Sequence, residues 1–496
     1  MSQAAEAARA AAVPARTILG QPRGLATLFL TEMWERFTYY GIQAVLILFM
    51  VAAASNGGLG LDDKTSSSIF GLFLGSTYLL GLLGGWIADR LLGAQRAVIG
   101  GGILIATGSA LLAIGNEGIF FIGLVVNAMG VGLLKPNISA IVASLYPEGG
   151  ARRDAGFSIF YMGINIGAAL GSFSVPLCAA AFGWRVGFAL PALFMTLGVA
   201  QFLWTRSYLG AAGLQPAHGQ RGSWTPVVAF LAAVAVIVML TLTRTVRLDA
   251  AVLAGAASWG YGLLALVYFV YLLFFAGLSR VERRRALVMV ALFVASVTFW
   301  AGYYQQGGSF NLFAERYTDR HMGAWEMPAG VLQAVNPFFV ITLAGVFAAL
   351  WIALGKRGRD PLASAKFGLA LIFLGAGFLL MYFAAQHVLA GQLVLPTWLV
   401  LTYFLHTCGE LCISPVGLSY MSKLAPPRFV GQAMGVWFLS LALGGNLAGQ
   451  LTGQYDASHI ESLPALFARI FWYGVITGVV MLLLTPFVKR MMAGVH

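Results

Sequence analysis

Five charged residues lie inside long apolar stretches of this sequence, and their types and spacing could do chemistry there. They are Glu32, Glu35, Arg36, Lys135 and Glu410. Charged side chains inside a membrane span are costly, rare and usually functional. We therefore expect these residues to form a site, with three acids and two bases.

The first apolar stretch carries a polar stripe. On a helix, Glu32, Glu35 and Arg36 stand at i, i+3 and i+4, and Tyr39 and Tyr40 continue the same face, over about 12 Å at 1.5 Å per residue. Because a lipid-facing stripe of this kind would be unfavourable, it should line a water-filled cavity. A simple Glu32–Arg36 pair at i,i+4 is the alternative, although it leaves Glu35 and the tyrosines unexplained.

Lys135 and Glu410 are each isolated in the sequence. Pro136 follows Lys135 and loosens the helix around it, and a lysine that merely extends to the membrane surface is the alternative. No Lys or Arg occurs between Lys366 and Lys423, so Glu410 needs a partner from another helix or must be protonated. Two cations early in the chain and one unpaired acid late in it suit a zwitterionic ligand.

The overall composition excludes a water-soluble protein. Of 496 residues, 30 are Lys or Arg and 18 are Asp or Glu, so only 10% are charged, while 59% are hydrophobic. The mean hydropathy is +0.83. The net charge of +12 does not indicate a nucleic-acid binder, because the basic residues form short clusters between apolar runs rather than one patch.

The apolar runs predict 14 transmembrane helices, arranged as six, two and six. The first six cover about 25–54, 67–88, 97–116, 118–146, 155–183 and 186–205. The inserted pair covers 224–243 and 250–279. The last six cover 286–314, 327–355, 367–386, 395–422, 429–453 and 466–488. The fold class is therefore all-α and polytopic.

The loop charges orient this topology. Of the 30 basic residues, 21 lie on the side that would hold both termini and 7 on the other side. Because cytoplasmic loops carry the excess of Lys and Arg, both termini are expected in the cytoplasm. The expected organisation is a tail at 1–24, a six-helix bundle at 25–206, a linker with two extra helices at 207–285, a second bundle at 286–490 and a tail at 491–496. Two such halves suggest a transporter with its site between them.

The motif EMWERFTYYG at 32–41 resembles the signature of the proton-coupled oligopeptide transporter family, within the major facilitator superfamily. Further matches are GGWIADRLLGAQR at 84–96, GLLKPNIS at 132–139, FSIFYMGINIGAAL at 157–170, FWAGYYQQGGS at 299–309, GELCISPVGL at 409–418 and GVWFL at 435–439. The resemblance covers nearly the whole chain except 221–285, and it implies a major facilitator fold with 6+6 helices plus two inserted helices.

The resemblance also implies roles for individual residues. Arg36 and Lys135 would meet the carboxylate of a peptide. The other residues implied in substrate binding are Tyr39, Tyr40, Tyr78, Asn165, Asn336 and Glu410, with Trp300, Ser414 and Trp437 shaping side-chain pockets. Those implied in proton coupling are Glu32, Glu35, Arg36 and Glu410. Those implied in gating are Asp89, Arg90, and a Lys135–Glu410 pair on the periplasmic side.

Two positions depart from the family pattern. Many members have an acid where this chain has Tyr304 and an arginine where it has Gln43. Both partners of one salt bridge are thus replaced together. We expect neutral hydrogen bonds to hold this gate, and coupling cannot depend on a seventh-helix carboxylate.

The sequence therefore predicts a symporter, not an enzyme, that imports di- and tripeptides with protons by alternating access. Its expected partners are these peptides, protons and the lipid bilayer of the cell inner membrane, with no nucleic acid and no cofactor beyond the proton gradient. Another small anion or a drug-like substrate on the same fold is the alternative, and a peptide receptor without transport is a further one.

Overall fold

The computed structural model describes residues 17–18, 20–147, 150–216, 222–243, 245–246, 248–455 and 460–492. Residues 1–16 of the predicted N-terminal tail and 493–496 of the predicted C-terminal tail lie outside the described residues. Within the described part of the N-terminal tail, strands β1 (Thr17–Ile18) and β2 (Gln21–Pro22) pair antiparallel.

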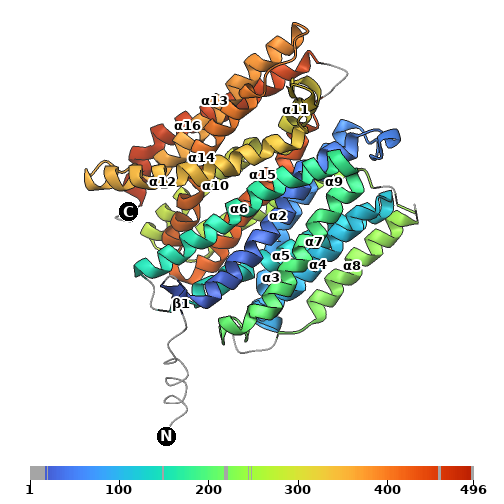
Figure 1. Ribbon diagram of the computed structural model, residues 1–496. Helices are drawn as coiled ribbons and strands as arrows, with labels where there is room; N and C mark the ends of the chain where they lie inside the picture. Colours follow the sequence, from blue (N-terminus) through green and yellow to red (C-terminus); the bar gives the residue numbers. More distant parts are fainter. Residues whose placement is uncertain are drawn as a thin grey trace.

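The rest of the described chain is almost entirely helical (Figure 1). The first half contains α2 (Arg23–Val51), α3 (Asp63–Ile87), α4 (Ala94–Ile114), α5 (Glu117–Ser144), α6 (Gly150–Phe182) and α7 (Trp184–Thr205). The inserted pair is α8 (Thr225–Leu242) and α9 (Ala250–Val270). The second half contains α10 (Arg280–Tyr303), α11 (Ser309–Tyr317), α12 (Val335–Lys356), α13 (Ala363–Leu389), α14 (Thr397–Leu424), α15 (Val430–Thr452) and α16 (Ser462–Met491).

Short elements connect these helices. They are the 3₁₀ turns η1 (Ala54–Asn56), η3 (Arg206–Leu209), η5 (Tyr304–Gln306), η6 (Ala329–Ala334) and η7 (Pro427–Phe429), the π-helical turns η2 (Ala88–Leu92) and η4 (Tyr271–Phe275), and the hairpin of β3 (His321–Met322) and β4 (Trp325–Glu326). Gly93 follows η2 with a φ of 80° and brings the chain into α4.

The predicted arrangement of six, two and six helices is confirmed. Among the described residues, twelve helices are long and apolar enough to cross a membrane. The other two of the fourteen are α2, which is 29 residues long but carries Glu32, Glu35 and Arg36, and α8, which is apolar but has only 18 residues.

The seventh helix of the core differs from its prediction as one continuous span at 286–314. It begins earlier, at Arg280, where Ser279 and Glu282 form a capping box. It then breaks at η5 and Gly308 before α11 continues to Tyr317. A Cβ on Gly308 would collide with the Thr452 side chain, so a glycine is required where α15 approaches this break.

Glycines also set the approach of α2 to α6. Gly163, Gly167 and Gly171 recur every four residues on one face of α6. A Cβ at Gly167 or Gly171 would overlap the carbonyl oxygen of Met33 or Phe37, respectively. Small residues at this spacing let two membrane helices pack backbone to backbone. This contact fixes α2, and with it the polar stripe, against the middle of the first half.

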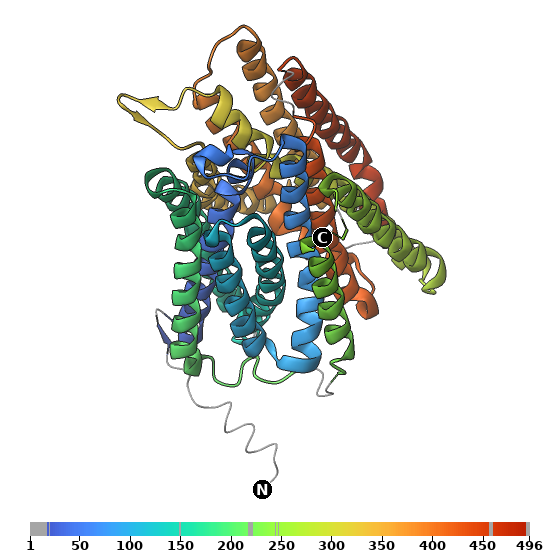
Figure 2. The same ribbon diagram turned by 90° about the vertical axis from the view of Figure 1, so that its right-hand side faces the viewer.

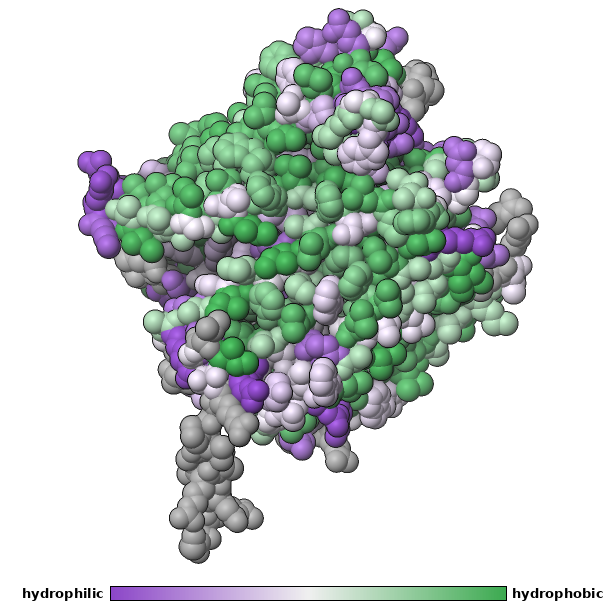
Figure 3. All heavy atoms as spheres, viewed as in Figure 1, coloured by the Kyte–Doolittle hydropathy of each residue, from purple (hydrophilic) through white to green (hydrophobic). Residues whose placement is uncertain are grey.

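The two halves meet over a long interface (Figures 1 and 2). Helix α3 of the first half packs on α15 of the second half, with Gly71 close to Asn446 and Gly449. Helix α9 packs on both α3 and α15, and the Asn446 amide donates to Ala254 O over 2.6 Å. Apolar side chains cover most of the face in Figure 3, with hydrophilic ones toward its margins, as expected where lipid surrounds the protein.

Candidate functional site

Arg36 is the centre of a buried charged cluster in α2. Arg36 and Glu32 are each 3% exposed, and Glu35 is fully buried. Arg36 Nε lies 3.1 Å from Glu32 Oε1 and also pairs with Glu35 Oε2. The predicted stripe therefore forms, and the i,i+4 pair that was its alternative is present as one part of a three-residue cluster.

This cluster is not saturated. Arg36 Nη2, Glu32 Oε2, Glu35 Oε1 and the Tyr39 hydroxyl are buried and have no hydrogen-bond partner within the described residues. Buried polar groups are normally paired, so Nη2 is a donor that can still accept a partner. A carboxylate on a bound molecule, or a water, would satisfy it. The guanidinium also faces the Tyr39 ring, 5.2 Å from its centroid.

Lys135 contacts α3 through an aromatic ring. Its ammonium nitrogen lies 4.2 Å from the centroid of the Tyr78 ring, within the range of a cation–π contact. Asn137, two residues further on, donates to Gly84 O at 3.1 Å and holds α5 against α3. Lys135 makes no ion pair with any described residue, so its charge is available to a ligand.

Glu410 lies in a neutral polar network of the second half. The Tyr303 hydroxyl donates to Glu410 Oε2 at 2.8 Å and lies 3.0 Å from Asn336 Oδ1. Asn336 Nδ2 donates to Glu410 Oε2 at 3.2 Å and to Thr407 Oγ1 at 2.9 Å. No cation among the described residues pairs with this carboxylate.

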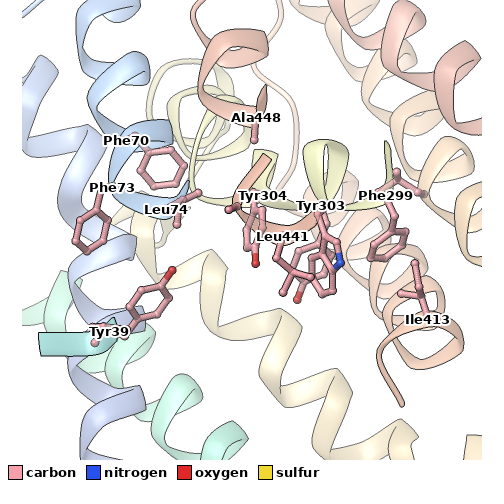
Figure 4. Close-up of a cluster of buried hydrophobic side chains, with 14 of the residues drawn as sticks. Tyr39, Phe70, Phe73, Leu74, Phe299, Tyr303, Tyr304, Ile413, Leu441 and Ala448 are labelled. Carbon is pink, nitrogen blue, oxygen red and sulfur yellow. The ribbon is translucent and has the colours of Figure 1, made fainter. Parts of the chain in front are cut away.

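Aromatic side chains connect the two charged groups. The Tyr304 hydroxyl donates to the Tyr78 hydroxyl at 2.6 Å, and its ring stacks on Trp300 with centroids 5.4 Å apart. Tyr303 packs edge-on against Trp300 at 5.1 Å. Figure 4 shows Tyr304 between Tyr39 on one side and Tyr303 on the other. The path from Lys135 to Glu410 is therefore lined by rings and hydroxyls.

The remaining residues predicted to bind substrate make the following contacts. Tyr40 packs edge-on against Tyr39 at 5.4 Å. Asn165 is buried and donates to Tyr161 O of its own helix at 2.9 Å. The Trp437 ring covers Gly417 and lies 6.2 Å from the Phe367 ring, while Ser414 is half-buried.

The structure places the residues implied in gating. Lys135 and Glu410 do not pair with each other in it, since each has other neighbours, so the Lys135–Glu410 gate stays a prediction. Asp89 and Arg90 lie in η2, at the end of α3, away from the buried charges.

Tyr303 and Thr407 were missed by the sequence reasoning. Tyr303 stands three residues after Trp300 and Thr407 three before Glu410, so each shares a helix face with a residue that was predicted. A search for polar residues three positions away from Trp300 and Glu410 would have identified both. Gln43 is buried against Gly307, and its Oε1 has no partner among the described residues.

The halves are also joined beyond the site, at the end of the bundle where α2 finishes. Arg316 and Asp63 form a two-pronged ion pair with distances of 2.8 and 2.7 Å. Asn311 Nδ2 donates to Ala44 O at 2.9 Å. These contacts connect α11 to α3 and α2, and they close this end over the charged cluster.

Comparison with known proteins gives one family and one fold. The sequence model of the POT family matches residues 95–473. The peptide transporter YePEPT of Yersinia enterocolitica is 42% identical, with 96% of each chain covered. A di-/tripeptide transporter of Lactococcus lactis is 32% identical, with 97% of this chain and 98% of the relative covered. A crystal structure of a mutant of the peptide transporter POT, in complex with alafosfalin, is 38% identical with a TM-score of 0.90, covering 98% of this chain and 99% of that one.

Proposed function

The chain belongs to the POT family, and we propose that it is a proton-coupled symporter that imports di- and tripeptides by alternating access. It has the major facilitator fold, with six plus six helices and two inserted ones. It is a multi-pass membrane protein and not an enzyme. Relatives named as a peptide transporter and a di-/tripeptide transporter support the substrate class.

One observation carries the proposal: opposite charges face a shared aromatic wall from the two halves. Arg36 and Lys135 belong to the first half, and Glu410 belongs to the second. The carboxylate of a short peptide would meet Arg36 and Lys135, while its amine would meet Glu410. A zwitterion of this kind uses charges on both sides, whereas a simple anion uses only the cations.

The remaining side chains have assigned roles in this proposal. Tyr39, Tyr40 and Tyr78 line the carboxylate end, while Asn165 and Asn336 hold the amine and the peptide backbone. Trp300, Ser414 and Trp437 bound side-chain pockets, which suits a transporter of varied peptides because large rings tolerate different apolar groups. Thr407 positions Asn336 through its hydroxyl.

Proton coupling would take place at the charged cluster of α2. Protonation of Glu32 or Glu35 removes an acceptor from Arg36 and frees the guanidinium for the peptide carboxylate. Peptide binding and protonation then favour each other, which is the thermodynamic requirement for symport. Glu410 is a third carboxylate that could carry a proton. One proton crossing about 100 mV supplies roughly 2.3 kcal/mol.

The proposed location is the cell inner membrane, with both termini in the cytoplasm. The supporting observation is the excess of basic residues in the loops on that side. The end of the bundle closed by Arg316 and Asp63 would then face the periplasm. Opening that end while the other closes would alternate access, with Lys135–Glu410, Asp89 and Arg90 acting in the gates.

The test is uptake of labelled dialanine into proteoliposomes under an imposed inward proton gradient. We expect the gradient to stimulate uptake, and Glu410→Gln to abolish it because the amine loses its partner. Glu117→Gln, the same substitution at an exposed site at the start of α5, is the control and should transport normally. Uptake that ignores the gradient would contradict symport.

A small anion or a drug-like molecule is the second candidate substrate. The only observation in its favour is that Glu410 already accepts hydrogen bonds from Tyr303 and Asn336, so the carboxylate has partners without a substrate amine. Competition separates the two candidates. Unlabelled dialanine should block uptake of labelled dialanine, while an equal concentration of nitrate should not.

A further inference from the structure

A groove lined by apolar residues separates the inserted helix α8 from the first half. The cavity has a volume of about 410 Å³. Its walls include Leu83 and Trp86 of α3, Leu133 of α5, and Val227 and Phe230 of α8. Every lining residue is apolar or glycine, so the groove cannot hold a peptide or any other strongly polar ligand.

Helix α8 is not packed directly onto the bundle. None of its described residues is buried, whereas α9 buries Tyr261 and Phe269 against its neighbours. Gly222, just before α8, donates from its backbone to Arg90 O at 2.9 Å and fixes the start of the helix. A gap between an anchored helix and its bundle forfeits dispersion contacts unless something fills it. In a membrane the available filler is a lipid chain.

Apolar contact alone would not retain one particular lipid, because the bilayer interior is as apolar as the groove. A polar group at the mouth is therefore needed. Arg90 lies in η2 between the lining residues Ile87 and Leu92, with its Cβ near Gly222, and its guanidinium makes no ion pair or hydrogen bond within the described residues. Trp86 and Trp224 line the same end, and tryptophans collect at the level of lipid headgroups.

The charges around this mouth favour an anionic headgroup. Arg96, at the start of α4, is a second basic residue, which is exposed and follows shortly after Leu92, a residue that lines the groove. Asp89 is the opposing charge, since its exposed carboxylate is adjacent to Arg90. Asp89, Arg90 and Arg96 together carry one net positive charge, which favours a phosphate with a neutral head, whereas a zwitterionic headgroup would bring its own cation to the same place.

We propose that this groove binds one acyl chain of an anionic phospholipid, with the lipid phosphate at Arg90. The bound chain fills the space between α8 and α3, α4 and α5 and completes the packing of the inserted helix. This site is separate from the peptide site and does not depend on the proposed transport function.

Native mass spectrometry of the full chain, released from detergent with added lipid, tests the proposal. Phosphatidylglycerol and phosphatidylcholine with identical acyl chains are compared. We expect the first to be retained about fivefold more than the second, the effect of one basic residue near an anionic lipid. If the wild-type protein retains both lipids equally, the proposal is wrong, and no variant is needed to show it.

Two variants then locate the site. Val227→Trp fills the groove and should reduce retained phosphatidylglycerol, whereas Val228→Trp places the same side chain on the adjacent residue, which is 59% exposed, and should not. Arg90→Gln should remove the preference for phosphatidylglycerol, and Arg90→Lys should restore much of it. Equal retention by Val227→Trp and Val228→Trp, with both variants melting like the wild type, would place the lipid elsewhere and refute the groove.

Discussion

The hydroxyl of Tyr304 donates a 2.6 Å hydrogen bond to the hydroxyl of Tyr78, across the boundary between the two halves. The family pattern implies an acid at the position of Tyr304, and we expected neutral hydrogen bonds to take the place of the missing ion pair; the bond to Tyr78 is such a neutral bond. Tyr78 also faces Lys135, and Tyr304 stacks on Trp300. The bond therefore connects the cationic side of the site to its aromatic wall.

Tyr304→Phe should favour separation of the halves at this point while keeping the ring stack on Trp300. Loss of one hydrogen bond is worth about 1 kcal/mol, so we expect the equilibrium between conformations to shift by about fivefold. Distances between spin labels placed on α3 and α11 measure the shift. Tyr78→Phe should have the same effect, and the double variant no more than either one, since both remove a single bond. Additive effects would show that the two hydroxyls act separately.

Asp63→Asn should weaken closure at the end of the bundle where Arg316 binds. The pair is two-pronged and partly buried, and hydrogen bonds between charged groups contribute about 1.5–3 kcal/mol. We expect faster labelling of a cysteine introduced beneath the pair. Asp62→Asn is the matched control, because Asp62 is an adjacent acid that caps α3 through Thr65 N and an Asn can still cap. Exchanging the two residues of the pair should restore slow labelling.

Glu32→Gln and Glu35→Gln should each abolish uptake driven by a proton gradient while sparing peptide counterflow. The neutral amide imitates the protonated acid and leaves Arg36 available to the peptide, so exchange without net proton movement can continue. Parallel assays of gradient-driven uptake and counterflow in one proteoliposome preparation check this. Loss of both activities in a well-folded variant would assign these residues to peptide binding instead.

Gly167→Ala should destabilise the protein by about 1–3 kcal/mol, the usual effect of overpacking. Its new Cβ would meet the Met33 carbonyl, and a backbone atom cannot move aside as a side chain can. Gly260→Ala in α9 is the control, because a Cβ there meets nothing within 4 Å and alanine favours the helix. Thermal unfolding of both variants in the same detergent checks this. The midpoint temperature of Gly167→Ala should be lower than that of the wild type, and that of Gly260→Ala should be unchanged or higher.

Tyr303→Phe should raise the KM for dialanine more than it lowers the maximal rate. The hydroxyl holds Glu410 and lies beside Asn336, so its loss leaves the carboxylate less well oriented for an amine. Removal of one hydrogen bond to a charged group predicts a change of roughly tenfold or more. Thr407→Val tests the same network one step away through Asn336 and should have a smaller effect.

Much of the helical arrangement could be predicted from the sequence because a membrane span must satisfy its own backbone and be apolar for about 20 residues. The five charged residues stood out for the same reason, since so few others interrupt those spans. Even the cluster of Glu32, Glu35 and Arg36 is local, because all three side chains belong to one helix face.

The break after Tyr303 was not predictable in the same way. Gly307 and Gly308 are compatible with a continuous helix, and the break is placed where Phe70 and Thr452 from distant helices would meet a Cβ. Likewise Tyr303 and Thr407 look like ordinary residues of apolar helices. Their roles come from hydrogen bonds to Asn336, which lies on another helix than either of them.

The sequence by itself determined that this chain crosses a membrane, how its helices are ordered, and which residues are charged within them, because those properties depend on composition along a single segment. Only the tertiary structure decided what those charges meet. The packing of separate helices brings the Tyr78 ring against the Lys135 ammonium and the Tyr78 hydroxyl within hydrogen-bonding distance of Tyr304, and it brings Tyr303 within hydrogen-bonding distance of Glu410. Side-chain contacts between distant segments depend on helix rotation and approach, which here are set by glycines such as Gly167 and their partners across the bundle.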